Sequence, residues 1–491
     1  MSVGYEALGF TANPFNSNTA EREPEIAAYA VHPPYLDRTE QASRTQGVFF
    51  LEGARGSGKS ATRLTVAKKL FTGRGGPLVV PLTSFNVFKP YIKNPLSLDL
   101  FATQIAFLVS ETLLAWLSTL SDIEKIQIQP PSAADKNLVS KFISNFYLNR
   151  SESSRVESAS ETYELIGTAL KTQAGIWVEK RWDSVTTSIV NIASMLGKKY
   201  ADLDIGDPSS FAEMVKKQKG DGFHDPIYTL KKAVEVARIY GFTGVLVQID
   251  KVDETEWTGS DLSAAASLIS PLLTNINLHE IEGVTWTFFV WDEVSNWIRG
   301  NLGQSVRFDK IPVGEIIWEV GYLLDLVSRR MSFFSGDKVK GLQDICEPGT
   351  DTSAKMQELI QLTRRSPRQL ISALDHILSA HIQRNLSTPK LLDSTALDGG
   401  MDSFALKGLK DIGMLDEART ISKLGTTSFV TKDVQDLLRQ GTQTARGRID
   451  RWVNNRLVVE DGTRPTGGAG RPVDQFSVSD PRVMRIVQRG L

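Results

Sequence analysis

The sequence predicts an α/β fold, in which helices flank a parallel sheet and further helical segments and a small C-terminal domain are attached. Two observations predict it. An apolar run at residues 48–51 leads into a glycine-rich loop and then into a helix at residues 61–70. A second apolar run, residues 244–250, follows a helix at residues 227–240 and ends in an acid. Short apolar runs that alternate with helical segments are typical of strands buried on both faces of a parallel sheet.

The glycine-rich loop carries the clearest chemical signal. Residues 53–60 read Gly-Ala-Arg-Gly-Ser-Gly-Lys-Ser and match the P-loop pattern. The backbone N–H groups of such a loop surround a phosphate, and glycines lack the Cβ atoms that would obstruct this. Lys59 is expected to reach the β- and γ-phosphates, and the helix that follows directs its partial positive charge at the anion. A chance glycine-rich turn is the alternative, which the preceding strand and the following helix disfavour. The residues expected to contact ATP are Gly53, Arg55, Gly56, Ser57, Gly58, Lys59, Ser60 and Ala61.

The second apolar run supplies the partner of this loop. Asp250 closes the strand at residues 244–249, at the Walker B position of a P-loop site. A carboxylate there holds Mg²⁺ through water, while the hydroxyl after the P-loop lysine binds the metal directly. We therefore predict ATP as the ligand and Mg²⁺ as its metal, held by Ser60 and Asp250.

Length and composition bound the rest of the chain. At 491 residues it is too long for one compact core, and about two to four domains are expected. The formal net charge of −1 excludes a general attraction to nucleic acid, so a nucleic-acid surface must be a local patch. The single cysteine, Cys346, excludes an internal disulfide framework, and no N-terminal signal is visible. We expect a cytoplasmic protein with no membrane partner.

The first 95 residues contain a leader and two strands. Residues 1–45 read as an irregular leader near the nucleotide, in which Phe15 or Tyr35 stacks on the adenine or, equally, only covers the edge of the domain. A second buried strand is predicted at residues 77–82. Together with the P-loop segment, residues 46–95 form the first part of the predicted ATPase core.

Residues 96–225 are predicted to form a helical insertion. The apolar stretch 100–117 is interrupted by polar residues and reads as a buried helix, not a membrane span. Apolar residues recur with heptad-like spacing over residues 178–196, which favours a helix packed in its own domain over an oligomer seam. The insertion carries no catalytic pattern, and a protein partner could bind there.

The second part of the core, residues 226–313, continues with two more strands. One covers residues 284–290 and ends before Asp292, and the last covers residues 307–313. Residues 314–395 are predicted to be a helical lid, with helices at residues 315–334 and 355–386.

Residues 401–491 read as a winged helix. Thr431 is predicted to cap a helix at residues 432–440, and a second helix covers residues 443–455. Strands at residues 457–460 and 475–478 would flank a glycine-rich wing. Such a surface suits contacts with double-stranded DNA, and the alternative is a winged helix that contacts protein. The residues predicted to contact DNA are Arg446, Arg448, Arg451, Asn455, Arg464 and Arg471.

The order of these elements resembles the AAA+ and STAND branches of the P-loop (ASCE) ATPases, and most of all the initiator-type ATPases of the origin-recognition group. The resemblance covers residues 40–390 and the winged helix. It implies that Asp292 senses the γ-phosphate, that Arg307 reaches the nucleotide of a neighbouring subunit, and that Arg368 faces the γ-phosphate from the lid. Each arginine has an alternative as a solvated or salt-bridged side chain.

The chain departs from this family at one catalytic position. The family places Glu directly after the Walker B Asp, where it polarises the attacking water, and here that residue is Lys251. A lysine cannot act as this base at neutral pH unless its pKa is strongly lowered. Glu254 could substitute if the chain turns back. Binding is therefore the firmer prediction, and turnover is expected to be slow or dependent on a partner.

Taken together, the sequence predicts an oligomerising, ATP-binding and ATP-hydrolysing switch that contacts DNA through its C-terminal domain. Lys59, Asp250, Glu254, Arg307 and Arg368 are the predicted catalytic residues. The alternative is a signalling or defence scaffold that binds ATP with little turnover and uses the helical insertion and the winged helix for protein partners.

Overall fold

The structure is a computed structural model of the chain, which divides into two compact units. The sheet unit is His32–Ile317, and the terminal unit combines Met1–Val31 with Trp318–Leu491. The described residues are 3–17, 23, 26–91, 96–121, 123–124, 128, 131–150, 162, 225–259, 261–385, 391–465 and 472–491.

The sheet unit is built on five parallel strands in the order β2-β3-β4-β1-β5. Strand β4 therefore lies between the strand before the glycine-rich loop, β1, and the strand before Asp250, β3. In the register of these strands, Gly53 lies opposite Trp291, and Ile249 lies opposite Phe288. The carboxyl ends of β1, β3 and β4 thus meet at one edge of the sheet. The strands are β1 Gly47–Gly53, β2 Leu78–Leu82, β3 Val245–Ile249, β4 Val284–Trp291 and β5 Val313–Glu315.

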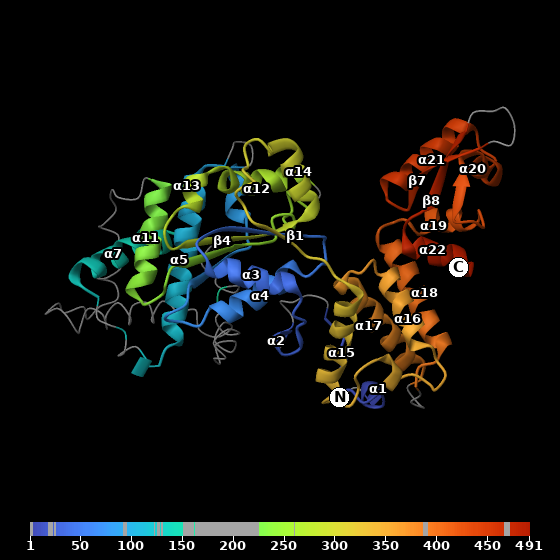
Figure 1. Cartoon of the computed structure of the whole chain (residues 1–491), viewed down its shortest axis with the longest axis horizontal. Helices are drawn as coiled ribbons and strands as arrows, with labels where there is room; N and C mark the ends of the chain where they lie inside the picture. The colour runs from blue at the N-terminus through green and yellow to red at the C-terminus, as the bar shows by residue number, and fades with distance from the viewer. Residues whose placement is uncertain are drawn as a thin grey trace. The chain divides into compact units, whose positions relative to one another are not determined.

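Helices cover both faces of this sheet (Figure 1). α3 and α4 lie along one face, and α12 and α14 lie along the other. α4 begins directly after the glycine-rich loop, so the sheet fixes where this helix starts. The helices of this unit are α3 Pro34–Arg44, α4 Lys59–Leu70, α5 Leu98–Thr119, α7 Ala133–Ile143, α11 Pro226–Ile239, α12 Leu262–Thr274, α13 Ile276–His279 and α14 Asp292–Leu302, with a 3-10 turn at Asn86–Tyr91 and a π-helical turn at Ser144–Leu148.

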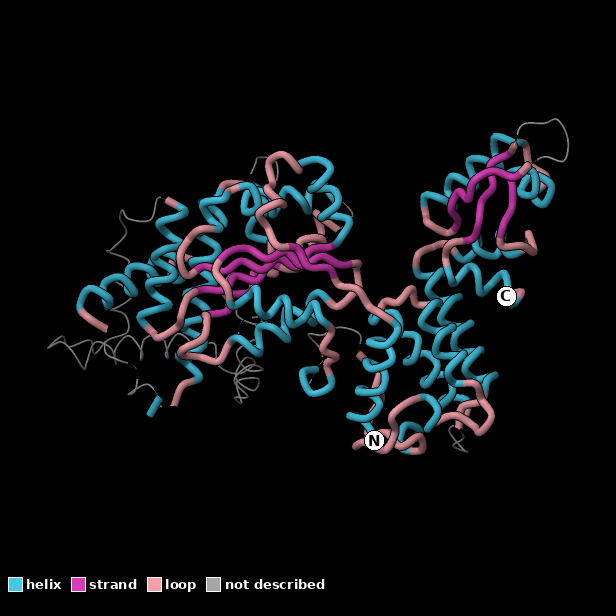
Figure 2. The backbone as a smooth tube through the Cα atoms, in the orientation of Figure 1, coloured by secondary structure: helices cyan, strands magenta, loops and turns pink. Residues whose placement is uncertain are grey.

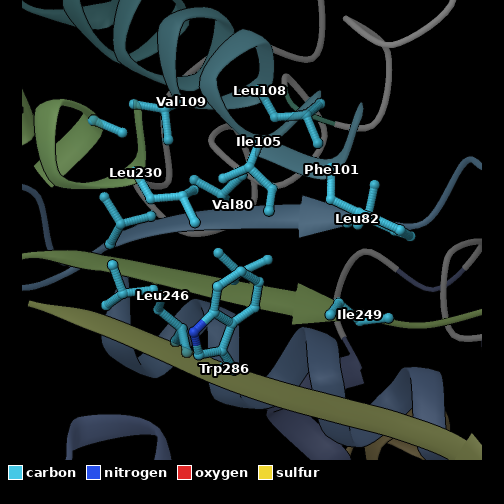
Figure 3. Packing of buried hydrophobic residues seen from close by; sticks show 14 of the residues in the cluster. Val80, Leu82, Phe101, Ile105, Leu108, Val109, Leu230, Leu246, Ile249 and Trp286 are labelled. Atoms are coloured by element: carbon cyan, nitrogen blue, oxygen red, sulfur yellow. The ribbon is translucent and has the colours of Figure 1, made fainter. Parts of the chain in front are cut away.

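α5 is the central helix of the core beside β2. Its apolar side chains, among them Ile105 and Val109, face Val80 and Leu230 (Figure 3). Leu98–Leu117 is the one described helix long and apolar enough to cross a membrane, and 89% of it is buried inside the protein. A helix that is apolar all round is expected in such a position. The prediction of a buried helix at residues 100–117 is confirmed.

Two sequence predictions in the sheet unit were wrong. The last strand is not residues 307–313, because this stretch turns, with the Lys310 N–H donating to the Arg307 carbonyl oxygen, and only Val313–Glu315 pairs with β1. Phe308 and Ile311 pack on the core from this turn, so their apolar side chains do not mark a strand. The leader is not irregular throughout either, since α3 is a regular helix that packs on α4. The predicted heptad-like seam at residues 178–196 lies outside the described residues.

The terminal unit packs its helices around a core that includes the start of the chain. Phe15 is 1% exposed within this core, so the structure supports its alternative role as a packing residue and not adenine stacking. Tyr35 packs, partly buried, against the core of the sheet unit. The Thr11 N–H donates to the Phe334 carbonyl oxygen at 2.7 Å. The helices here are α1 Val3–Glu6, α2 Ile26–Tyr29, α15 Val320–Ser335, α16 Thr352–Leu362, α17 Pro367–Arg384 and α18 Ser394–Asp411, with a 3-10 turn at Leu342–Asp344.

The predicted lid helix at residues 355–386 is two helices, α16 and α17. The chain breaks between them because Arg364 and Arg365 have positive φ angles of 52° and 56°, and Ser366 then caps α17 by accepting from the Gln369 N–H. A proline at the first position of α17 agrees with a helix start. Residues 396–400, which the sequence left between the lid and the winged helix, lie inside α18.

Residues 415–491 of the terminal unit form a small domain of helices and one antiparallel sheet (Figure 2). The strand order is β6-β8-β7, and two successive helices, α20 and α21, precede the β7–β8 hairpin. α20 begins at Thr431, which is not its cap; the Asp433 carboxylate accepts from the Val430 N–H instead. The elements are α19 Leu415–Ser422, β6 Ser428–Val430, α20 Thr431–Leu438, α21 Thr442–Asn454, β7 Val458–Arg464, β8 Val473–Val478 and α22 Pro481–Arg489.

Candidate nucleotide-binding site

The glycine-rich loop has the backbone that a phosphate-binding loop needs. Gly56 and Gly58 have φ angles of 78° and 97°, in the left-handed region where glycine is favoured. A Cβ on Gly53 would lie 2.7 Å from the Ser57 Oγ and 3.0 Å from the Ile316 Cβ, so a side chain there would have to displace its neighbours. α4 begins at Lys59, so the positive end of its dipole lies at the loop.

Lys59 lies at the centre of the site. Its Nζ donates to the carbonyl oxygens of Gly53 at 2.9 Å and Ala54 at 3.1 Å. Burial lowers the pKa of this ammonium, while the charges of Asp253, Asp250, Asp292 and Glu254 act to raise it. A lysine that is held by its own loop and has carboxylates on several sides is suited to exchange these contacts for a phosphate.

The structure brings Asp250, Asp292 and Glu254 close to Lys59, although they come from different strand ends. β1, β3 and β4 are neighbours, so Asp250 after β3 and Asp292 after β4 lie at the same sheet edge as the loop. Asp292 is the first residue of α14, and its Oδ1 accepts from the Glu293 N–H. The charges of these carboxylates act on Lys59, and their roles at a nucleotide stay predictions.

Asp250 is engaged by an arginine that the sequence interpretation missed. The Arg63 Nε donates to the Asp250 Oδ2 at 3.0 Å, and the two side chains are 6% and 2% exposed. The Asp250 Oδ1 accepts from the Lys251 N–H at 2.9 Å. Helix periodicity gives the signal for this contact, since Arg63 follows Lys59 by four residues and shares its side of α4.

The predicted Mg²⁺ site at Ser60 and Asp250 does not fit this arrangement well. A carboxylate that holds a metal-bound water is most effective when its negative charge is uncompensated, and here a buried guanidinium compensates it. Ser60 is half-buried in the first turn of α4.

Arg55 connects the loop to the ends of β3 and β4. Its Nε donates to the Asp253 Oδ2 at 2.9 Å, and one Nη donates to the Gly259 carbonyl oxygen at 2.8 Å. The guanidinium carbon lies 3.9 Å from the centre of the Trp291 ring, which is a cation–π contact. The predicted nucleotide contact from Arg55 would therefore require these interactions to rearrange. Asp253 and Trp291 were not singled out by the sequence interpretation.

The residue after Asp250 has an unusual backbone. Lys251 has a φ angle of 64°, and its carbonyl oxygen accepts from the Glu254 N–H at 3.1 Å. The chain therefore turns back after β3, which is the condition under which Glu254 could replace the missing glutamate. Glu254 is exposed and acts electrostatically on Lys59.

Arg307, the predicted finger, and Arg368, the predicted sensor of the lid, are both exposed. Arg307 is 48% exposed and makes two hydrogen bonds with Asp309, at 2.8 and 2.6 Å. The hydrogen bonds from Arg307 lower the pKa of the Asp309 carboxyl. Arg368 lies in the terminal unit, exposed in the first turn of α17, and its role stays a prediction.

The predicted DNA-contacting residues of α21 meet an acid that the sequence interpretation did not place there. Glu417 of α19 lies 3.9 Å from the Arg448 Nε and 3.4 Å from an Arg451 Nη, and it accepts from the Trp452 Nε1. Arg446 is exposed. Asn455 is exposed and donates to the carbonyl oxygen of Arg451, and Arg464 is exposed at the end of β7. Arg471 lies outside the described residues.

No protein-family model matches the sequence, and no curated protein matches it. Among solved structures, the chain is similar to the ORC2 protein of Aeropyrum pernix in its ADP form. The alignment covers 98% of this chain and 99% of that chain, with a TM-score of 0.35 and 11% sequence identity. At this TM-score and identity, function has to be argued from the site itself.

Proposed function

We propose that this chain binds ATP in the loop of residues 53–60 and works as a nucleotide-dependent switch. The observation that carries the proposal is the loop itself. Left-handed glycines, the start of α4 and the Lys59 ammonium converge at one edge of a parallel sheet. A triphosphate satisfies such a site, because backbone N–H groups and a cation are the groups that bind phosphate oxygens. The position of β4 between β1 and β3 supports the ASCE branch of P-loop ATPases.

The contacts of Arg55 give the switch a physical basis. This residue lies inside the loop and binds Asp253 after β3 and Trp291 at the end of β4. A phosphate that moves the loop would also move or release these contacts. The loop at residues 250–259 and the start of α14 would then change with the occupancy of the site.

Hydrolysis is proposed to be slow. Lys251 carries a positive charge where the family has a base, and Glu254 reaches the site only through an exposed turn. Glu254 would take the proton of the attacking water, and Lys59 would stabilise the charge that develops on the γ-phosphate. Arg307 from a neighbouring subunit and Arg368 would complete the site in an oligomer. The exposure of both arginines is compatible with this role.

We propose that the C-terminal domain is a winged helix that contacts duplex DNA. A helix pair followed by a hairpin supports this assignment, with exposed arginines on α21 and β7. Arg446 and Arg464 carry the contact more strongly than Arg448 and Arg451, because Glu417 compensates the latter two. Binding is expected to weaken as salt rises.

The alternative is an ATP-binding scaffold with little turnover that binds protein partners. The compensated charge of Asp250 and the lysine at position 251 favour weak hydrolysis. Steady-state ATP hydrolysis of the full chain, with and without duplex DNA, separates the two functions. Stimulation by DNA favours the DNA-contacting switch, and negligible hydrolysis with tightly retained ATP favours the scaffold.

Equilibrium dialysis of the full chain with radiolabelled ATP tests nucleotide binding. Lys59→Ala is expected to weaken binding by about tenfold or more, because a charge-assisted contact is lost. Lys231→Ala is the matched control, since Lys231 is an exposed lysine of the same unit, on α11, and should leave binding unchanged. Equal affinities for unmodified and Lys59→Ala protein would overturn the proposed function.

The identity of the base has its own test. Glu254→Gln is expected to abolish the remaining hydrolysis, while Lys251→Glu should not raise it. If Lys251→Glu accelerates hydrolysis and Glu254→Gln has no effect, then Glu254 is not the base.

A further inference from the structure

The side chain of Arg63 is the unexplained feature of the site. It is a permanently charged group, 5% exposed, and it begins one turn after Lys59 on the same side of α4. Only its Nε has a hydrogen bond among the residues that the structure describes, and that bond goes to Asp250. The terminal nitrogens donate to no described residue, and they are not among the fully buried polar atoms that lack a partner, so solvent or a ligand can reach them.

Its location links it to the phosphate-binding loop. Asp250 acts electrostatically on Lys59, and Arg63 binds Asp250 directly. Lys59 and Arg63 are therefore two cations on one helix, both beside the carboxylate that the P-loop pattern would give to the metal. A divalent cation placed there would meet the positive charge of Arg63 and a carboxylate that is already compensated.

We propose that Arg63 takes the place of the divalent metal at this site, so that the nucleotide binds without Mg²⁺. The inference rests on the proposed function, because it concerns the same loop. The Nε–Asp250 contact holds the guanidinium in place, and the terminal nitrogens donate to phosphate oxygens. A guanidinium suits this task because its planar donors match phosphate geometry and stay charged at every physiological pH.

Binding of a fluorescent ATP analogue to the full chain, in excess EDTA and in millimolar Mg²⁺, tests the proposal without any substitution. The dissociation constant in EDTA is expected to stay within about threefold of that in Mg²⁺, since the charge is supplied by the protein. Binding only in Mg²⁺ would overturn the role of Arg63 and leave the proposed nucleotide site standing. Absence of binding in both solutions would overturn the proposed function itself.

Three variants sharpen this result. Arg63→Met should lose about tenfold or more in EDTA, because a charge-assisted contact to phosphate is lost. Arg63→Lys keeps the charge and should retain most of the metal-independent binding. Arg238→Met is the matched control, since Arg238 pairs with Glu282 at 3.0 Å in the same unit, at the surface, and should change neither value. Equal affinity of Arg63→Met and unmodified protein in EDTA would contradict the proposal.

Manganese gives a second measurement that does not depend on the variants folding. Electron paramagnetic resonance detects whether the complex of protein and ATP retains Mn²⁺ more tightly than ATP alone. The proposal predicts no added retention by the protein. Added retention of Mn²⁺ by the unmodified protein would show that the protein holds the metal and would overturn it.

Discussion

Two buried arginines, one in each unit, bind carboxylates in different ways. Arg63 of the sheet unit and Arg485 of the terminal unit are each about 5% exposed. Arg485 uses all three of its nitrogens: Nε donates to Asp402 at 2.6 Å, Nη1 to Glu358, and Nη2 to Asp398 at 3.2 Å. Arg63 has one such bond, to Asp250.

The difference separates a structural ion cluster from a binding site. The carboxylates around Arg485 come from α16 and α18, so the C-terminal helix α22 is joined to two helices of the lid region. Its donors are satisfied, and no ligand is needed. The terminal nitrogens of Arg63 donate to no described residue, and they belong to the helix that follows the glycine-rich loop. The same residue type, equally buried, therefore serves packing in one unit and ligand binding in the other.

The largest expected effect is that of Arg485→Met. Removing the cation leaves three carboxylates with only the more exposed Lys355 and Arg489 as partners. Breaking a buried ion pair from one side typically costs about 3–5 kcal/mol. Hydrogen exchange measured by mass spectrometry should show faster exchange in α22 and α18 and unchanged exchange in α4. ATP affinity should not change.

Arg489→Met is the matched control for this variant. Arg489 binds Asp402 and lies near Asp398, the same carboxylates, but it is 40% exposed. An exposed pair contributes about 0–1 kcal/mol, so exchange in α22 should change little. If both variants destabilise α22 equally, the packing role assigned to Arg485 is wrong.

Arg63→Met is expected to cost less stability, about 1–3 kcal/mol, although its side chain is equally buried. Only one hydrogen bond is lost, and Asp250 keeps its bond to the Lys251 N–H and the nearby charge of Lys59. Hydrogen exchange of β3 and α4 measures the loss. A cost as large as that of Arg485→Met would indicate that Arg63 is mainly a structural residue.

The stability of the terminal unit is expected to depend on pH, with a smaller effect than that of the arginine variants. The lowered pKa of Asp480 determines its sign. Burial acts to raise the pKa of Asp480, but hydrogen bonds and charge from Arg482 and the charge of Arg364 outweigh it, so the pKa is lowered. A carboxyl whose pKa is lower in the folded state stabilises above its unfolded value of about 3.9, and this stabilisation is lost as the pH falls through the folded value.

Asp480→Asn isolates this contribution. Asparagine can still cap α22 but carries no charge, so the variant should melt at a lower temperature than the unmodified chain at pH 6. Calorimetry below about pH 4 should show the two melting temperatures converging, because a protonated aspartate resembles asparagine. A difference that stays constant with pH would exclude the charge of Asp480 as its cause.

The contrast between the arginines also shows what the sequence could and could not predict. Residues 53–60 and Asp250 were recognisable because each element of the P-loop pattern is local in sequence. The pairing of Arg63 with Asp250 joins residues 187 positions apart and depends on the strand order. Likewise, Glu417 beside Arg448 and Arg451 could not be placed, since α19 was not predicted and its packing on α21 is a tertiary contact.

The backbone conformation could not be predicted from the sequence where the residue type favoured a different structure. The lid helix was predicted to be continuous through Arg364 and Arg365, because arginine favours helices, yet both have left-handed backbones. The strand predicted at residues 307–313 failed because apolar side chains in a turn, such as Phe308 and Ile311, also pack on the core. Glycines at positions 364 and 365 would have indicated the break between the two helices.

The smallest predicted effect is the stability gained when glycine replaces a residue with a left-handed backbone. Lys251 of the sheet unit and Arg439 of the terminal unit allow this gain to be compared. Both are non-glycine residues in the left-handed region, with φ angles of 64° and 50°. Arg439 ends α20, where glycine is the usual residue, and Arg439→Gly should stabilise by about 0.5–1 kcal/mol. Calorimetric melting of the full chain measures this gain.

Lys251→Gly relieves the same backbone cost after β3, so a similar gain is expected if the side chain only tolerates its position. The measurement that separates the two residues is ATP affinity in EDTA, because Lys251 directly follows the carboxylate that binds Arg63. If Lys251→Gly leaves the ATP affinity in EDTA unchanged, then Arg63 and Lys59 alone supply the positive charge that binds ATP without metal. A loss of affinity in Lys251→Gly, with stability gained, would make Lys251 a third cation of the site.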